Sequence, residues 1–203
     1  MLGPGFLDLP VRSGKPRRTG ITHVLDRGIP LAQVSDLLEQ NGCYVDVWKL
    51  GWGIAYVDPQ LAAKLDLLAW HRVLASPGGT LLEIAWAQGR TSEFLDWAAD
   101  AGFPCVEVSA GTVPMEDAAK RDLIAAAAER FIVLAEVGSK RAAVRLTPEQ
   151  WAQAAECRTG CSRRPRTRYR PGRRRIGRCP WPPPGRPDTR GAAANHHDPL
   201  RHR

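Results

Sequence analysis

Short apolar runs recur along the first 136 residues, and each of them reaches a charged residue. The charged residues stand at positions 26, 49, 83, 107 and 136, so the steps between them are 23, 34, 24 and 29 residues. One strand with its crossover helix takes about 30 residues. A charged end adds nothing to the packing of a buried strand, whereas the carboxyl ends of parallel strands often line an active site. The pattern therefore predicts repeated strand–helix units with charged residues at one rim.

The alternation of strand and helix patterns indicates an α/β fold with parallel strands and right-handed crossovers. A closed barrel and an open doubly wound sheet both satisfy this pattern. Thr147 and Pro148 are a typical helix start, which opens a last helix at Trp151. Strands are expected at about 20–26, 44–50, 72–76, 104–109 and 131–136, and helices at about 30–41, 59–71, 91–101 and 115–129.

The whole-chain net charge of +8 conceals two unlike parts. Residues 157–203 hold 14 Arg, no Lys and two acidic residues, whereas residues 1–156 carry a net charge of −4. The last part also has eight prolines and no apolar periodicity, so it cannot bury enough apolar surface to become ordered. We divide the chain into a lead-in over 1–19, a folded domain over 20–156 and a disordered Arg/Pro-rich tail over 157–203.

The composition of the tail suggests that it is an out-of-frame translation. Dense Arg and Pro, added Cys and His, and the absence of Lys are what GC-rich DNA gives when it is read in the wrong frame. We therefore hypothesise a frameshift near codon 156. The C-x3-C of Cys157 and Cys161 has no downstream ligands at a recognised zinc spacing, so no metal site is expected there.

No apolar stretch reaches the roughly 18 residues that a membrane span needs, and the N-terminus has no basic segment followed by an apolar core. Cys43 and Cys105 are interpreted as small buried side chains in a reducing compartment. We expect a cytoplasmic chain without membrane contact.

The charged strand ends suggest a binding site for a metal and an anion. Several carboxylates with one Lys suit a divalent cation, which prefers hard oxygen ligands, together with an anionic substrate. For each residue alone, a solvated strand end is the alternative. The glycine-rich segment 77–80 would let backbone amides approach an anion. The glycines of 51–53 leave space beside Lys49, and Trp52 is a candidate pocket wall. His23 is expected in the core or behind the residues that contact substrate, rather than as a base, and Asp46 faces outward or pairs with a cation.

Four ordered motifs resemble the phosphosulfolactate synthase family of coenzyme M biosynthesis. They are Val47–Gly53 (VWKLGWG), Pro77–Glu83 (PGGTLLE), Val106–Thr112 (VEVSAGT) and Leu134–Gly138 (LAEVG), and the resemblance covers about residues 15–156. It implies a lyase with a TIM-barrel fold that adds sulfite to phosphoenolpyruvate with Mg²⁺, giving (2R)-phospho-3-sulfolactate. The expected fold is then an incomplete TIM (β/α)8 barrel of about five βα units, truncated before the sixth strand and followed by the disordered basic tail.

The resemblance and the strand-end chemistry together assign roles to particular residues. Lys49 is the first candidate to protonate the substrate or bind its anion, and Lys140 is the second. The expected metal ligands are Glu83, Glu107 and Glu136. The expected substrate-binding residues are Asp26, Gly51, Gly53, Gly78, Gly79, Thr80 and Ser109.

Two alternatives stay open. Ala110, Ser139 and Ser76 depart from the family pattern, so the chain could be another Mg²⁺-dependent TIM-barrel lyase that acts on an enol phosphate. The other alternative is a non-catalytic half-barrel with a basic arm that contacts nucleic acid nonspecifically. On the enzyme hypothesis the partners are phosphoenolpyruvate and sulfite, loss of the last strands impairs activity, and a homo-oligomer remains open.

Overall fold

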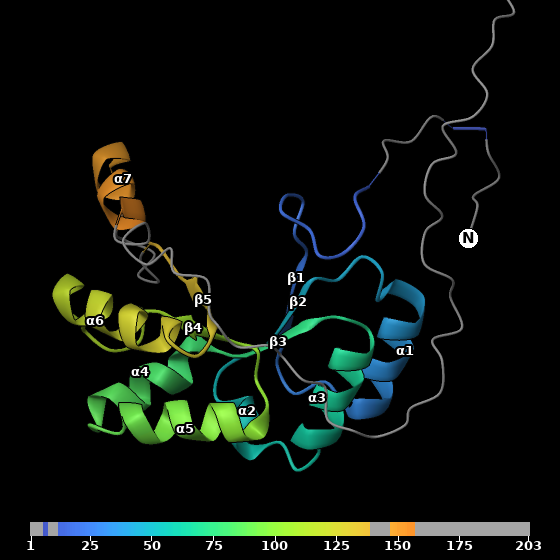
Figure 1. The fold of residues 1–203 in the computed structure, drawn as a ribbon, viewed down its shortest axis with the longest axis horizontal. Coiled ribbons are helices and arrows are strands. Elements are labelled where there is room, and N and C mark those ends of the chain that lie inside the picture. The colour runs from blue at the N-terminus through green and yellow to red at the C-terminus, as the bar shows by residue number, and fades with distance from the viewer. Residues whose placement is uncertain (1–5, 8–11, 139–146, 157–203) are drawn as a thin grey trace, which may run out of the picture. The chain divides into compact units, whose positions relative to one another are not determined.

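Five short parallel strands form the centre of the fold in the computed structural model, which describes residues 6–7, 12–138 and 147–156 (Figure 1). The expected tail over 157–203, and Lys140 and Ser139, lie outside the described residues. The five expected strands are confirmed in shorter form: β1 (His23–Asp26), β2 (Val47–Leu50), β3 (Leu74–Pro77), β4 (Cys105–Val108) and β5 (Ile132–Ala135).

Parallel pairing is confirmed for every strand pair in the described part. Hydrogen bonds join β1, β2 and β3 in that order, and a second ladder joins β4 to β5. A side-chain contact links the two ladders, since the Cys105 thiol donates to the carbonyl of Ala75 over 3.2 Å. The arrangement is a mixed α/β fold consistent with a partial TIM-barrel-like architecture, and the described residues do not close a barrel.

Helices connect the strands and cover them (Figure 1). They are α1 (Leu31–Asn41), α2 (Ile54–Val57), α3 (Leu61–Trp70), α4 (Gly79–Ala87), α5 (Thr91–Ala101), α6 (Asp117–Ala128) and α7 (Pro148–Glu156). The expected capping of α7 is confirmed, because the Gln150 amide donates to the Thr147 hydroxyl over 3.3 Å. In the described ranges, no helix has the length and apolar character to cross a membrane.

Helix α4 corrects one expectation from the sequence. The glycine pair after β3 was expected to form a turn with Glu83 at a strand end, but Gly78 is the N-cap of α4 and Gly79 its first residue. Glu83 therefore lies in the second turn of a helix. The apolar residues on either side of it belong to α4 rather than to an extended strand, and Leu82 packs in the core.

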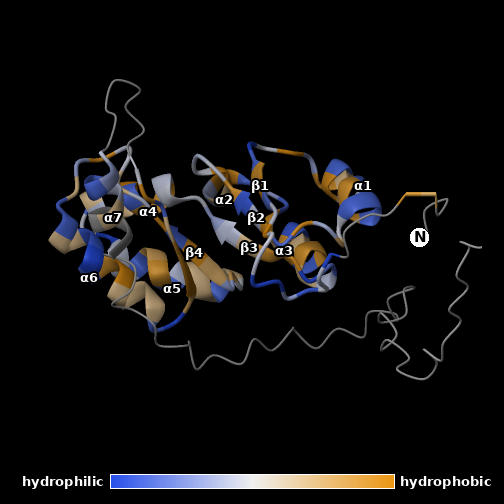
Figure 2. Ribbon diagram, turned by 90° about the horizontal axis from the view of Figure 1, so that it is seen from above, coloured by the Kyte–Doolittle hydropathy of each residue, from blue (hydrophilic) through white to orange (hydrophobic). Residues whose placement is uncertain are grey.

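The core lies between the strands and the inner faces of the helices. Strand residues such as Trp48 and Val106 are at most 1% exposed, as are the helical residues Leu38, Leu68 and Leu82. Figure 2 shows hydrophobic residues along β4 and hydrophilic residues on outer turns of α1 and α6. This one-sided burial is what the helical spacing of apolar residues predicts.

Two cations of the described lead-in tie it to the amino ends of the strands. Arg17 pairs with Asp46 at 2.7 Å, which confirms a salt bridge for that acid. Lys15 donates to the carbonyls of Gly42 and His71 over 2.6 and 3.1 Å. These carbonyls end α1 and α3, so one ammonium caps two helix C-termini. Burial is the main reason that the pKa of Lys15 is lowered to about 8.

Candidate functional site

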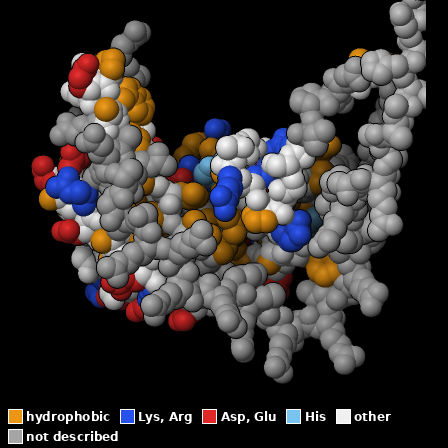
Figure 3. All heavy atoms as spheres, turned by 45° about the horizontal axis from the view of Figure 1, so that its top comes forward, with side chains coloured by type: hydrophobic (Ala, Val, Ile, Leu, Met, Phe, Trp, Pro, Cys, Tyr) orange, Lys and Arg blue, Asp and Glu red, His pale blue; other side chains and the backbone are white. Residues whose placement is uncertain are grey.

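A pocket of about 480 Å³ opens at the carboxyl ends of the strands. All five strands, or the residues that follow them, supply its polar lining: His23 from β1, Lys49 from β2, Gly79 and Thr80 after β3, Glu107 from β4 and Glu136 after β5. Leu25, Trp52 and Leu134 add apolar walls. The space-filling view shows hydrophobic side chains exposed beside Lys, Arg and His side chains near the middle of the described part (Figure 3).

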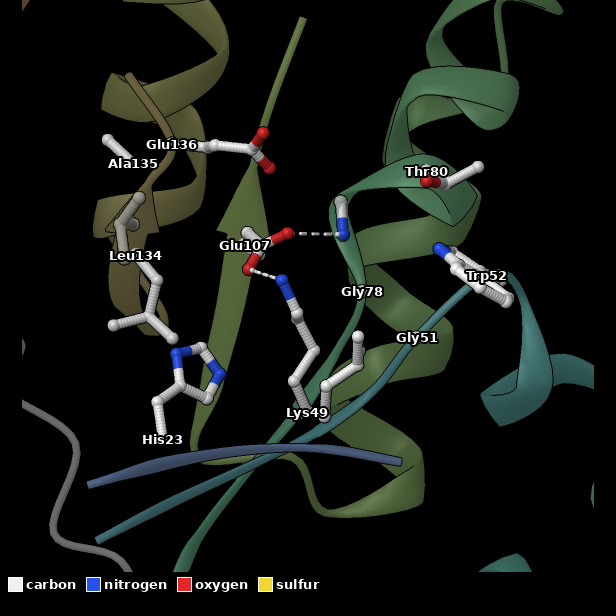
Figure 4. A pocket seen from close by; sticks show the side chains of 13 residues that line it. His23, Lys49, Gly51, Trp52, Gly78, Thr80, Glu107, Leu134, Ala135 and Glu136 are labelled. Carbon is white, nitrogen blue, oxygen red and sulfur yellow. Dashed lines mark hydrogen bonds and ion pairs between the residues drawn. The ribbon is translucent and has the colours of Figure 1, made fainter. Parts of the chain in front are cut away.

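A lysine–carboxylate pair lies at the centre of the pocket. Lys49 Nζ is 2.9 Å from Glu107 Oε2, and the Gly79 amide donates to Glu107 Oε1 over 3.1 Å. Both charged side chains are mostly buried, with 21% of Lys49 and 7% of Glu107 exposed. Figure 4 shows Lys49 pointing at Glu107, with Glu136 and Thr80 on opposite sides of the opening. Glu107 thus holds a cation and the N-terminal amide of α4 together.

His23 lines this pocket instead of packing in the core. It is exposed on β1, so the core alternative for His23 is wrong. Partial burial lowers the pKa of His23, and the nearby Lys49 ammonium lowers it further, so the imidazole is neutral at pH 7. A neutral imidazole offers the pocket one donor and one acceptor.

Asp26 lies at the expected strand end, but its carboxylate is buried and hydrogen-bonded to other groups of the protein. It is fully buried, and it accepts hydrogen bonds from Trp48 Nε1 at 3.0 Å and Lys64 Nζ at 3.1 Å. The amides of Gly28 and Ile29 donate to its other oxygen. Burial alone would raise the pKa of Asp26, but these hydrogen bonds outweigh burial and lower it. Asp26 therefore anchors the β1–α1 loop and does not line the pocket.

Lys64 is the buried ion-pair partner of Asp26, and the sequence analysis did not predict it. Its amino group lies between Asp26 and Asp58, 2.6 Å from the Asp58 carboxylate, and the residue is 1% exposed. A signal for this burial was present, since Lys64 lies on the same helical face as Leu61 and Leu68. A lysine among apolar positions of a helix indicates a buried charge with a partner.

Glu83 binds the loop after β4 and does not face the pocket. It is fully buried and accepts hydrogen bonds from the Ser109 hydroxyl and from the amides of Gly111, Thr112 and Val113, the last two at 2.6 and 2.8 Å. Burial alone would raise the pKa of Glu83, but these four donors lower it below the ordinary value of 4.5. Ser109, expected to bind substrate, instead binds Glu83.

Three glycines allow the strand ends to approach one another. A Cβ on Gly78 would lie 3.0 Å from the Cα of Gly51, and a Cβ on Gly51 would lie 2.5 Å from Leu25 Cδ1. A Cβ on Gly79 would collide with Ser109 and come within 3.1 Å of Glu107 Oε1. These glycines are needed for close packing around the pocket, which is a structural role in addition to any contact with substrate.

Most of the site residues expected from the sequence are brought together, although not all. Seven line the pocket: Lys49, Gly51, Gly78, Gly79, Thr80, Glu107 and Glu136. Asp26, Gly53, Glu83 and Ser109 do not line it. Trp52, a candidate wall, lines it as expected.

The three carboxylates expected to hold a metal do not form a group. Among the residues that the structure describes, no three His, Cys, Asp or Glu side chains gather in a way that could hold a metal ion. Only Glu107 and Glu136 of the expected set face the same pocket. Mg²⁺ is commonly bound by one or two carboxylates together with substrate anions, so the donor chemistry of this pair fits Mg²⁺ in that reduced form.

The fold and pocket define a mixed α/β chain with parallel strands, consistent with a partial TIM-barrel-like fold, whose candidate site places a lysine beside a carboxylate. Comparison with known proteins agrees with this class. The model of the (2R)-phospho-3-sulfolactate synthase (ComA) family matches residues 10–161, and the chain belongs to this family.

Three relatives, each named phosphosulfolactate synthase, are similar to the chain. The one from Bacillus subtilis is 38% identical over 149 residues, which cover 72% of this chain and 59% of the relative. The one from Methanothermobacter thermautotrophicus is 43% identical over 134 residues, 64% of this chain and 52% of the relative. A third, from Methanocaldococcus jannaschii, is 37% identical over 124 residues, 60% of this chain and 49% of the relative. The chain thus spans about half to three fifths of the length of these relatives.

Proposed function

We propose that this chain carries the first part of the active site of a phosphosulfolactate synthase, a lyase that adds sulfite to phosphoenolpyruvate to give (2R)-phospho-3-sulfolactate. The observation that carries the proposal is the Lys49–Glu107 pair in the pocket, which lies within the segment matched by the family. The substrates are small anions, and the proposed place of action is the cytoplasm.

In the proposed reaction, sulfite forms a C–S bond at C3 of phosphoenolpyruvate, and C2 then takes up a proton. Charge develops on the substrate carboxylate during the first step, and a cationic side chain nearby stabilises it. Lys49 fits this task because Glu107 fixes its amino group inside the pocket. The same ammonium is the proposed proton donor to C2, with Lys140 as the second candidate. The Gly79 amide at the start of α4 supports this placement of Lys49, because it donates to Glu107 Oε1 and so helps to fix the carboxylate that holds the ammonium.

We propose Mg²⁺ as the cofactor. Glu107 and Glu136 would provide its protein oxygen ligands, and when bound the ion would neutralise charge on the substrate carboxylate. Lys120 of α6 supports this arrangement, since it donates to the main-chain carbonyl of Glu136 over 2.6 Å. That hydrogen bond fixes the backbone directly after β5, where Glu136 lines the pocket.

The direct test is product formation from phosphoenolpyruvate and sulfite by residues 1–156 joined to the remaining C-terminal part of the Bacillus subtilis relative. Lys49→Ala should lower turnover at least about 1000-fold, since it removes both the anion contact and the proton donor. Lys49→Arg keeps the charge but cannot deliver a proton, so it should retain substrate binding and still lose turnover. The exposed Glu93→Gln serves as the control, with unchanged turnover. Near-normal turnover of Lys49→Ala would reject the assigned role.

The tail also bears on the function. The nucleic-acid alternative depends on residues 157–203, which lie outside the described residues. The family match instead covers the described domain, which favours the enzyme hypothesis. A related lyase acting on another enol phosphate would use the same pair of charged side chains. Comparing turnover of phosphoenolpyruvate with turnover of other enol phosphates distinguishes a phosphosulfolactate synthase from such a related lyase.

A further inference from the structure

Arg27 stacks on one wall of the pocket. Its guanidinium carbon lies 4.6 Å from the centre of the Trp52 ring, a cation–π distance, and Trp52 lines the pocket. Arg27 is exposed and follows Asp26, the last residue of β1. Arg27 does not itself line the pocket, but it contacts a residue that does, whereas the neighbouring Asp26 is fully buried.

The guanidinium of Arg27 has no carboxylate partner within the described ranges. Three other arginines in this part of the chain are paired at short distance: Arg17 with Asp46 at 2.7 Å, Arg90 with Glu93 at 2.8 Å and Arg130 with Asp96 at 2.6 Å. Arg27 instead contacts the Trp52 ring, and this contact with a pocket-lining residue sets it apart. A guanidinium carries five N–H donors in its own plane, and contact with a ring face leaves donors at its edge available to an anion.

The backbone on both sides of this stack is fixed. Asp26 accepts hydrogen bonds from the amides of Gly28 and Ile29, the residues directly after Arg27. Trp52 has a left-handed φ of 53°, which a bulky residue adopts only when its surroundings enforce it. The Gly51 amide donates to the Asp26 carbonyl over 2.8 Å, which ties the two loops together. Arg27 and Trp52 are therefore held as one preorganised rim element.

The protein side chains that line the pocket supply a single cation for an anionic substrate. The described lining contains Lys49 and two acids, Glu107 and Glu136, a net charge of −1 with His23 neutral before any Mg²⁺ binds to the two acids. The proposed substrates are all anions, and the one lining ammonium is already paired with Glu107. On the basis of the proposed function, we infer that Arg27 is a substrate-binding residue that takes the phosphoryl group of the enol phosphate in a bidentate contact.

The test is calorimetric titration of phosphoenolpyruvate, and separately of sulfite, into the full 203-residue chain. Arg27→Ala should weaken phosphoenolpyruvate binding about ten- to a hundredfold, since a charge-assisted bidentate contact is lost. The phosphoenolpyruvate affinity of Arg27→Lys should lie between those of the unaltered chain and Arg27→Ala, because lysine keeps the charge but cannot make a bidentate contact. Sulfite binding should change less than threefold. The matched control is Arg90→Ala, an exposed arginine outside the pocket, which should bind like the unaltered chain.

Each result separates this inference from the proposed function. If the unaltered chain binds phosphoenolpyruvate and Arg27→Ala binds it equally well, the role of Arg27 is rejected while the proposed function stands. If sulfite binding falls as much as phosphoenolpyruvate binding, Arg27 acts through the general charge of the rim and the phosphoryl assignment is rejected. If the unaltered chain does not bind phosphoenolpyruvate at millimolar concentration, the proposed function fails for this chain and the Arg27 assignment fails with it.

Discussion

Four carboxylates of similar sequence context have two different chemical roles. Asp26 and Glu83 accept four donors each from the protein and are fully buried. Glu107 and Glu136 line the pocket. Fully satisfied buried carboxylates stabilise loops, and removing them leaves unpaired donors. In the described residues Asp26 and Glu83 support two loops that flank the pocket, and their expected contacts with substrate and metal stay predictions.

Glu83→Gln should lower the free energy of unfolding by about 2 kcal/mol at pH 7, because a neutral amide presents an N–H group to donors that now lack an acceptor. The pKa of Glu83 is lowered in the folded chain, so its contribution is present above the ordinary value of 4.5 and is lost as the pH falls through the folded value. The difference between the two chains in urea unfolding should therefore shrink below pH 4.5.

The control for this measurement is Glu93→Gln. Glu93 also has a lowered pKa, with Arg90 as the main cause, but it is exposed and its ion pair is screened by solvent. Its replacement should leave the unfolding curve unchanged. A Glu83→Gln difference that is equally large at pH 3.5 and pH 7 would show that the carboxylate charge is not what holds the loop.

At the scale of elements, sequence patterns were sufficient for the strands and insufficient for the β3–α4 junction. The five strands are short, apolar and regularly spaced, so their existence and parallel direction could be predicted from residues such as Val47 and Val106. Helix α4 was missed because Gly78 and Gly79 are typical turn residues. The bond between Glu83 and Ser109 joins positions 26 residues apart, and no local pattern encodes such a pair.

Gly79→Ala tests this junction. A Cβ at this position would collide with Ser109 and press on Glu107, so α4 must shift away from β4. We expect a loss of about 1–3 kcal/mol in the free energy of unfolding, typical of overpacking, and weaker phosphoenolpyruvate binding because Glu107 no longer holds Lys49 in place. Gly14→Ala is the matched control, since a Cβ there meets no atom within 4 Å. Equal stability of the two variants would contradict the close approach.

At the scale of the whole chain, composition and family similarity change at nearly the same position. The family match ends at residue 161, and the Arg/Pro-rich composition begins at 157. The relatives contain as much as half of their length outside the matched segment. The prediction of a frameshift near codon 156 accounts for both observations and rests on the sequence alone.

Resequencing the gene across codons 145–203, with translation of all three frames, tests this prediction. Another frame should encode a sixth strand with a Glu/Arg/Gly cluster and about 100 further residues, since a complete barrel needs about 250 residues. If no frame continues the barrel, the basic tail is genuine. The nucleic-acid alternative would then rank above the enzyme.

The cations of the lead-in and the pocket lie at opposite ends of the same strands, and this separation has an evolutionary consequence. Arg17 and Lys15 tie the amino ends, where a change disturbs the fold. Arg27 and Trp52 lie on loops at the carboxyl ends of the strands, and hydrogen bonds to the buried Asp26 already fix the backbone there. Selection can therefore exchange rim side chains, and with them the preferred anion, without a matching loss of foldability. Substitutions at a small set of rim positions, which contribute little to the stability of the fold, would then be enough to change the substrate during evolution.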